Sequence, residues 1–409
     1  MSSIRVLVCN AGTIRVFRVA EELNRHRLLD RCATSLYFEP DSFQCFPTPL
    51  RKRIEIMTVN RRCEALSGMV CTHAFPEVAH ILANKFGVGD TANWIIWRNR
   101  KFGQWVARHC LDDIDVIWSF DTSSLEIFEA AKKIDIRCIL DVSIAHPRLG
   151  KRIFREHAEK RPEYAADLDD HISAAHMDRR LREMELADCL VAGSSFVAES
   201  LMSEGIYENK IRVNPYGVNL EMFAGQDRSF SDVPPVFLFV GWFSQRKGIY
   251  YLLEAWEKAK IYETGAKLRL VGGHRDELHF WKKSLPENVG ILGCLSHDQL
   301  PAVYAEADVF VFPSLFEGFA KVILEALASG LPVITTPHAC DAAVVIDGEN
   351  GLLTEPGDVA GLGAAMKLIG TDKVLMKAMS QEARVVSSKY SWSAYGELCR
   401  DICLEMAAT

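Results

Sequence analysis

Two carboxylates eight residues apart, Glu317 and Glu325, are the residues of this chain whose type and spacing point to binding chemistry. A carboxylate accepts two hydrogen bonds, so each of them suits a pair of neighbouring hydroxyl groups on a sugar or a ribose. The alternative is that Glu317 is an ordinary acid at a helix N-terminus and that Glu325 is a solvated helix residue. The spacing alone is compatible with both interpretations.

The elements around the pair favour a binding site. Residues 307–337 are expected to form a strand, a loop, a helix and a second strand. The runs VFVF (309–312) and PVITT (332–336) are short and apolar, as in parallel strands buried on both faces. Apolar residues of the helix between them repeat at i, i+3, i+4 and i+7, and Glu325 lies off that packed side.

The start of this helix predicts an anion site. If it begins near Phe319, the N–H groups of Phe319, Ala320 and Lys321 point into the crevice at the carboxyl ends of the strands, where the helix dipole favours a phosphate. Glu317 and Glu325 can then reach hydroxyl groups on opposite sides of that phosphate. A sugar nucleotide has this layout, with its sugar and its ribose on either side of a diphosphate.

The stretch EGFAKVILEALASGLPVI resembles the E-x7-E segment of retaining glycosyltransferases of family 4. The likeness is strong over nearly all of the second half of the chain and weak over the first. It implies the GT-B fold, an α/β protein whose two Rossmann-like domains face each other across a cleft. It also implies that a UDP-, GDP- or ADP-sugar donor binds mainly to the C-terminal domain and a sugar or lipid-linked acceptor to the N-terminal domain.

The chain has 409 residues, which is enough for two domains with separate cores. We expect an acceptor-binding domain at 1–225, a nucleotide-sugar-binding domain at 226–389, and a helix at 390–409 that crosses back to the first domain. The opening strand and small-residue turn, followed by a helical stretch at 14–29, are Rossmann-like but lack the G-x-G-x-x-G pattern of nicotinamide enzymes.

The resemblance assigns roles to individual residues. Glu317 would hold the sugar hydroxyls and Glu325 the ribose. Lys247 would neutralise the donor diphosphate, together with the backbone amides from Gly318 to Lys321. Trp242 replaces an arginine that the family usually has, so Arg246 or an arginine of the first domain would compensate.

Three further assignments follow from the resemblance, and two of them have a plain structural alternative. Gly12 and Thr13, in the first loop, would approach the donor or the acceptor, or would form only a tight turn. His146 would be a catalytic residue near the donor sugar, or a structural histidine. The nucleotide base would contact Gly293, Cys294 and Leu295.

The sequence predicts neither a metal nor another cofactor. Asp113 and Asp115 mimic a D-x-D triplet, but they precede a strand, which favours ordinary loop acids. Without a metal, Lys247 and helix amides must stabilise the leaving diphosphate. Retention with no evident nucleophilic carboxylate suggests front-face substitution, in which the leaving diphosphate helps to deprotonate the acceptor hydroxyl.

The composition limits the class of protein. A formal charge of −7 without a long basic run argues against nucleic acid as a partner. The 12 cysteines show no regular spacing, which suggests a reducing compartment and hence the cytoplasm. The N-terminus enters a strand at once, so we expect no signal peptide.

Residues 48–110 differ from the rest of the chain because they are basic. Within them, 93–108 (NWIIWRNRKFGQWVAR) mixes Trp94, Trp97 and Trp105 with Arg and Lys. Tryptophan beside cations at helical spacing is typical of a helix at a membrane interface, so peripheral contact with the inner face of a membrane is one interpretation. An ordinary core helix with one solvated face is the other.

Two other functions use the same phosphate site. An epimerase or hydrolase acting on a sugar nucleotide would release sugar without an acceptor, but it would need a water-activating base in the cleft. A non-catalytic sensor of sugar nucleotides would bind the donor without turnover. The expected role, assembly of a cell-surface polysaccharide or glycolipid, rests on the resemblance.

Overall fold

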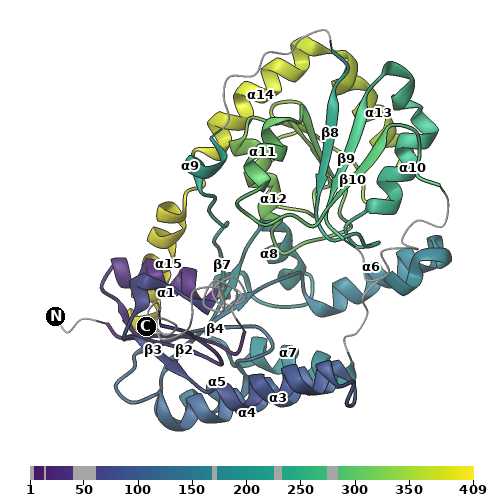
Figure 1. Ribbon diagram of the computed structural model, residues 1–409. Helices are drawn as coiled ribbons and strands as arrows, with labels where there is room; N and C mark the ends of the chain where they lie inside the picture. The colour runs from purple at the N-terminus through teal and green to yellow at the C-terminus, as the bar shows by residue number, and fades with distance from the viewer. Residues whose placement is uncertain (1–3, 13–14, 40–60, 168–172, 225–232, 274–283) are drawn as a thin grey trace, which may run out of the picture.

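The structure is a computed structural model and describes residues 4–12, 15–39, 61–167, 173–224, 233–273 and 284–409. It contains two parallel sheets, each lying between layers of helices, one above the other in Figure 1. The carboxyl ends of both sets of strands face the boundary between the two halves, where open α/β sheets bind their ligands. This is the two-domain α/β fold that the sequence predicted.

The first sheet has seven parallel strands in the order β3-β2-β1-β4-β5-β6-β7. Their bounds are β1 Val6–Asn10, β2 Leu29–Thr34, β3 Val70–Thr72, β4 Val116–Phe120, β5 Arg137–Val142, β6 Cys189–Ala192 and β7 Ile211–Val213. The helices of this half are α1 Val16–Arg25, α3 Ala74–Lys85, α4 Thr91–His109, α5 Leu125–Ala131, α6 Pro147–Lys160, α7 Ala174–Leu186 and α8 Ser195–Met202, with the short turns η2 Glu64–Leu66, η3 Lys132–Ile134, η4 Pro162–Asp167 and η5 Glu208–Lys210.

The second sheet has six parallel strands in the order β10-β9-β8-β11-β12-β13. Their bounds are β8 Val236–Val240, β9 Lys267–Val271, β10 Val289–Gly293, β11 Val309–Phe312, β12 Val333–Thr335 and β13 Gly351–Leu353. The helices around it are α9 Leu220–Phe223, α10 Ile249–Ala259, α11 Leu300–Ala305, α12 Lys321–Ala328, α13 Val359–Thr371 and α14 Lys373–Ser387, with the turn η6 Ile261–Thr264. The chain closes with α15 Trp392–Ala408.

The first helix is shorter than the sequence pattern indicated. We expected a helical stretch at 14–29, but α1 ends at Arg25 and Leu29 already begins β2. The sequence of β2, LDRCAT, does not have the apolar pattern of a strand because two of its residues are charged. Asp30 is neutralised by Arg5, whose Nε lies 2.8 Å from Oδ1, which lets a polar strand pair beside β1.

The closing helix α15 returns to the first half of the chain, as predicted. It packs against α1, and Figure 1 shows it beside that helix while α14 remains on the second sheet. The segment that leaves the first half and the segment that returns to it cross at Gly217, where an added Cβ would lie 2.5 Å from the Trp392 backbone nitrogen. The Val218 N–H also donates to the Tyr390 carbonyl at 2.9 Å, so the two crossings form one hinge.

A second bridge joins the halves through α6, which leaves the first sheet and packs on α10. Tyr164 stacks on Tyr250 with ring centroids 3.8 Å apart. His157 Nδ1 and the Tyr251 hydroxyl lie 2.8 Å apart, so α6 contacts the second half directly. Among the described helices, none combines the length and the hydrophobicity needed to cross a bilayer.

Candidate active site

Glu317 lies in a buried cluster of opposite charges after strand β11. Its Oε1 is 2.6 Å from the Lys247 ammonium and 2.7 Å from Arg246 Nη1. The Ser314 hydroxyl donates to the same oxygen at 2.9 Å. Three donors thus converge on Oε1, whereas no donor among the described residues reaches Oε2, which can still accept a hydrogen bond from a ligand.

The cluster fixes the protonation state of Glu317. Burial is the largest influence and by itself raises the pKa of this carboxyl, but the charges of Lys247 and Arg246 and their hydrogen bonds outweigh it and lower the pKa to about 2. Burial also lowers the pKa of Lys247, and Glu317 opposes that effect. Glu317 is therefore a carboxylate at neutral pH and a weak nucleophile.

A tight turn between β8 and α10 positions Lys247. Gly248 adopts a φ of +75°, and a Cβ there would lie 1.9 Å from the Pro313 carbonyl oxygen. Only glycine fits such a conformation and such an approach. The turn is therefore pressed against the loop that follows β11, which brings Lys247 and Arg246 to Glu317.

Glu325 lies on α12 and is held by two side chains of its own domain. The buried Tyr304 hydroxyl donates to Oε2 at 3.1 Å, and His297 Nε2 lies 3.3 Å from Oε1. Burial is the main cause that raises the pKa of Tyr304 well above its ordinary value, so its hydroxyl stays a donor. Glu325 is oriented by this bond and points to the boundary between the domains.

Helix α12 begins later than expected, and this corrects one part of the predicted anion site. We expected a start near Phe319 with three N–H groups directed at a ligand, but the first helical residue is Lys321. The Ala320 N–H donates to the Ala339 carbonyl at 2.9 Å, so this amide is taken. Ala339 lies in the loop that follows β12.

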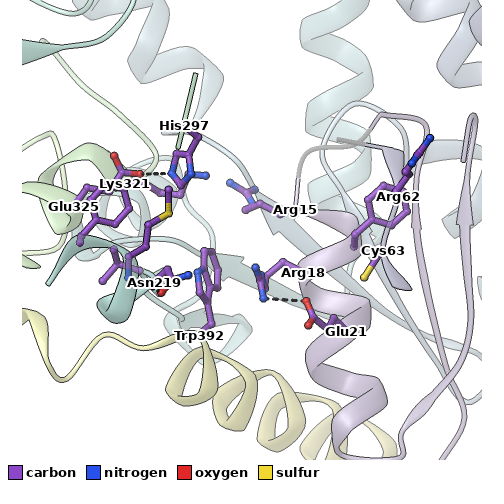
Figure 2. A pocket seen from close by; sticks show the side chains of 15 residues that line it. Arg15, Arg18, Glu21, Arg62, Cys63, Asn219, His297, Lys321, Glu325 and Trp392 are labelled. Atoms are coloured by element: carbon purple, nitrogen blue, oxygen red, sulfur yellow. Dashed lines mark hydrogen bonds and ion pairs between the residues drawn. The ribbon is translucent and has the colours of Figure 1, made fainter. Parts of the chain in front are cut away.

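A cavity of about 460 Å³ lies between the two halves and is lined by Lys321 and Glu325, among others (Figure 2). Its other charged lining residues are Arg15, Arg18, Glu21 and Arg62 of the first half, and His297 lies beside Glu325. Four cations thus line it against two carboxylates. Residues of the hinge complete the wall: Gly217, Val218, Asn219, Met222, Phe223 and Trp392.

Arg15 is the cation of the first half that is held most firmly. It has a φ of +54°, which is uncommon for a residue with a side chain. Its Nη2 bonds to Asp141 Oδ1 at 2.7 Å and to the Ser143 hydroxyl at 3.1 Å, and its guanidinium lies 4.4 Å above the Tyr216 ring. The Nε atom is buried and has no hydrogen-bond partner among the described residues. Figure 2 shows this side chain directed toward His297 and Lys321.

Sequence reasoning did not find Arg15, Arg18, His297 or Trp392 as lining residues. Arg15 follows the small-residue loop after β1, and only that position could have indicated a ligand contact from the sequence. An arginine at the start of a helix does not by itself indicate a binding site. Trp392 and His297 come from distant parts of the chain. They line the same cavity because the chain crosses back to the first half at the start of α15.

His146 does not line this cavity. It is buried at the start of α6, where its Nδ1 accepts the Arg148 N–H at 3.4 Å and its own N–H donates to the Ser200 hydroxyl at 2.9 Å. Burial is the main cause that lowers its pKa to about 4, so the ring is neutral. In this placement His146 serves as the N-cap of α6.

Several other predicted residues also lie outside the cavity. Gly12 forms a turn in which its N–H donates to Asn10 Oδ1 at 3.1 Å, and Thr13 lies outside the described residues. Gly293 ends the edge strand β10, Cys294 and Leu295 follow it, and Cys294 lies near Trp242 and Gly273. The half-exposed Trp242 is not among the residues that line the cavity.

The D-x-D-like triplet lies at the opposite end of the first sheet. Asp113 and Asp115 both contact Arg5, at 3.3 Å from Asp113 Oδ2 and 2.8 Å from Asp115 Oδ2. They precede β4, whereas the cavity lies beyond the carboxyl ends of the strands. The triplet is therefore a set of loop acids, as the sequence favoured.

The two domains touch beside Glu317. The Ser194 hydroxyl donates to the Gly318 carbonyl at 2.8 Å, and the Ser195 N–H donates to Asp341 Oδ2 at 2.8 Å. A Cβ on Gly318 would lie 1.8 Å from the Ser143 oxygen, so glycine is required for this approach. The cleft is closed at Gly318 and open at the Glu325 cavity.

Comparison with known proteins gives this arrangement a context. Residues 234–372 match the family model described as glycosyl transferases group 1. The chain is 32% identical over 211 residues to the lipopolysaccharide core biosynthesis glycosyltransferase LpsE of Rhizobium meliloti, which is 49% of this chain and 59% of that protein. It is 29% identical over 164 residues to the glycogen synthase of Mycobacterium tuberculosis, 39% of this chain and 40% of that protein. The chain thus spans about half the length of these relatives.

Solved structures show the same fold over the whole chain. The sucrose-phosphate synthase of Thermosynechococcus elongatus superposes with a TM-score of 0.68 at 18% identity, covering 99% of both chains. Anabaena Alr3699/HepE in complex with UDP and glucose gives a TM-score of 0.64 at 16% identity, covering 99% of this chain and 100% of that one. The fold is therefore that of GT-B glycosyltransferases, and the matched family domain coincides with the second sheet.

Proposed function

We propose that this protein is a retaining, metal-independent glycosyltransferase that moves a hexosyl unit from a nucleotide-diphosphate sugar to an acceptor hydroxyl. The observation that carries the proposal is the placement of Glu325 and Lys321 in one interdomain cavity, with the Glu317 cluster at the other end of the same loop and helix. A cavity of about 460 Å³ has the size of a small-molecule site.

The charges of the site suit a sugar nucleotide. Glu325 is oriented by Tyr304 and would accept hydrogen bonds from the ribose hydroxyls. Lys321 of the second half and Arg15 of the first face the same space and would pair with the diphosphate. Arg15 would thus replace the positive charge that is missing at Trp242, where the resembled family usually has an arginine. The free Oε2 of Glu317 would accept a sugar hydroxyl.

Lys247 would act on the leaving group. In the structure its ammonium is paired with Glu317, and both ends of the pair are buried. A diphosphate that enters beside it brings two further negative charges, and we expect Nζ to move from one carboxylate oxygen toward the phosphate. Stabilisation of the developing charge by a fixed cation is usually a large part of the rate enhancement.

The state of Glu317 favours front-face substitution over a covalent intermediate. A carboxylate whose pKa is held near 2 by two cations and a hydroxyl is a poor nucleophile. The leaving diphosphate would therefore take the proton of the acceptor hydroxyl, and the sugar would keep its anomeric configuration. Relatives such as LpsE motivate the further proposal of a role in cell-surface polysaccharide or glycolipid assembly, at the cytoplasmic side of a membrane.

Product analysis tests this function. The protein is incubated in EDTA with each α-linked nucleotide sugar and an acceptor mixture, and the anomeric coupling of the product is read by NMR. We expect nucleotide diphosphate release that depends on the acceptor, and an α-linked product. A β-linked product would refute retention, release of free sugar without an acceptor would indicate a hydrolase, and binding without turnover would indicate a sensor.

A further inference from the structure

The outward side of α3 carries apolar residues where a solvated helix would carry polar ones. Five large side chains lie exposed between residues 75 and 86: Phe75, Val78, Ile81, Leu82 and Phe86. Phe75 and Phe86 are 68% and 72% exposed. At 100° per residue these positions fall on one side of the helix. Contiguous exposed apolar surface of this kind marks an interaction site.

The fold itself directs this side outward. The opposite side of α3 packs against α4 through buried residues that include Pro76 and Ala83. Glu77 anchors it, with ion pairs to Arg61 at 2.6 Å and to Arg98 at 3.0 Å. Because the polar anchor faces inward, a rotation that buried the apolar side would break two ion pairs and expose their charges.

Helix α4 continues the apolar side with aromatic residues. The Phe75 and Trp97 rings lie 6.2 Å apart, and Trp94 and Trp97 lie 5.2 Å apart. The Trp94 Nε1–H donates to the Val88 carbonyl at 2.6 Å, which fixes the turn between the helices. Membrane contact was one of two interpretations of 93–108, but its tryptophans are half-buried, and the apolar side chains most exposed in this region are Phe75 and Phe86.

Most of the exposed charges around this surface are positive. The exposed charged residues of α3, α4 and the turn between them are the cations Lys85, Arg100, Lys101 and Arg108 and the single acid Asp90. Asp90 is occupied as the N-cap of α4, where it accepts the Ala92 N–H at 2.6 Å. An apolar centre with tryptophan and cations at its rim matches a bilayer that contains anionic lipid.

We propose that this α3–α4 face, formed by Phe75, Val78, Ile81, Leu82, Phe86, Lys85 and Lys101, docks on a bilayer surface containing anionic phospholipid. In Figure 1, α3 and α4 lie on the side of the first sheet that faces away from the second half of the chain. Docking there leaves the relative movement of the two halves unhindered. The proposal concerns a surface outside the cavity and does not depend on the transferase activity.

Vesicle sedimentation of the full chain tests the proposal. We expect binding to vesicles of phosphatidylcholine with phosphatidylglycerol, and at least tenfold weaker binding to phosphatidylcholine alone or in 1 M salt. Phe75→Ser/Phe86→Ser should weaken binding at least tenfold, and Lys85→Glu/Lys101→Glu should abolish the preference for anionic lipid. The control Tyr207→Ser/Val374→Ser removes two side chains that are 79% and 81% exposed elsewhere and should bind as the unaltered protein does.

Three results would overturn the proposal. The first is an unaltered protein that stays in the supernatant with anionic vesicles. The second is a Phe75→Ser/Phe86→Ser variant with a melting temperature several degrees below that of the control, because the face would then be covered within the protein. The third is a concentration-dependent dimer in light scattering that this variant loses, because the face would then pair two copies of the chain.

Discussion

The ammonium of Lys247 lies 2.6 Å from Oε1 of Glu317, where the two domains meet; Glu317 is buried and Lys247 is largely buried. This pair joins the turn before α10 to the loop after β11. Its partner Arg246 contacts the same oxygen. Removal of one member leaves the others with an unbalanced buried charge, so each substitution here affects stability as well as binding.

Replacement of Lys247 should affect turnover more than any surface lysine does. We expect Lys247→Ala to lower kcat about 100-fold or more, because a fixed cation near the leaving diphosphate is lost. Lys258→Ala, at an exposed position of the helix α10 that follows Lys247, is the matched control and should retain full activity. Steady-state kinetics with saturating donor measures both. Equal kcat values in the two variants would remove Lys247 from the phosphate site.

Glu325→Gln should weaken donor binding with little change in stability. Glutamine keeps an acceptor for the Tyr304 hydroxyl but loses the charge and one acceptor for a ribose diol. We expect a dissociation constant at least tenfold higher, about 1.4 kcal/mol, by calorimetric titration. Glu306→Gln, which alters an exposed carboxylate paired with Arg269, should leave the constant unchanged. If the two variants bind donor equally, Glu325 does not contact it.

Gly318→Ala should prevent the closed arrangement of the domains. Its Cβ would lie 1.8 Å from the Ser143 carbonyl oxygen, which no side-chain rotation can relieve. We expect a larger radius of gyration in solution scattering and at least tenfold lower turnover. Gly290→Ala meets nothing within 4 Å and has ordinary φ, so it serves as the control. A scattering profile identical to that of the control would show that closure tolerates the methyl group.

His146 should contribute to the acid sensitivity of the fold. Its pKa is lowered from 6.5 to about 4 in the folded protein, chiefly by burial, so between these values the unfolded chain binds more protons. Stability therefore falls as pH falls from 6.5 to 4. We expect His146→Gln to reduce this loss by at least about 1.4 kcal/mol, the value of one pKa unit.

Urea denaturation at several pH values measures the effect of this substitution. The slope of the unfolding free energy against pH is informative even if the loss of the helix cap lowers stability at every pH. An unchanged slope in His146→Gln would mean that the ring is already protonated in the folded state.

The architecture could be predicted because parallel strands buried on both faces have a distinct sequence pattern. VFVF of β11 and VFLFV of β8 are continuous apolar runs, and both are central strands. The polar strand β2 escaped notice, since Asp30 and Arg31 lie near the amino end of the sheet, where charge is tolerated. A strand that is only partly buried does not reveal itself through hydrophobicity.

The candidate site was predictable only within single segments. Glu325 and Lys321 share one helix, so their spacing implied their joint position. The start of that helix was placed two residues too early, because the Ala320 amide is bonded to Ala339, a residue of another loop. Arg15 faces the same cavity from the first half of the chain, and no local pattern relates the two.

The exposure of α3 was not predictable for a related reason. Its apolar residues have the spacing of a core helix, and the sequence does not say which side packs inward. The direction is decided by the ion pairs of Glu77 with Arg61 and Arg98, which bring together three separate segments. Membrane contact was one interpretation of the tryptophans of α4, whereas the proposed face lies mainly on the neighbouring helix α3.

A thermal-shift screen tests the donor site most directly. UDP, GDP, ADP and their sugar conjugates are compared in EDTA and in magnesium, with the unaltered protein and Glu325→Gln. A ligand at a hundredfold excess over its dissociation constant stabilises the folded state by about 2.7 kcal/mol. We expect one nucleotide to raise the melting temperature in EDTA, and the variant to lose most of the shift. No shift with any nucleotide, or an equal shift in Glu325→Gln, would contradict the assignment of this cavity to the donor.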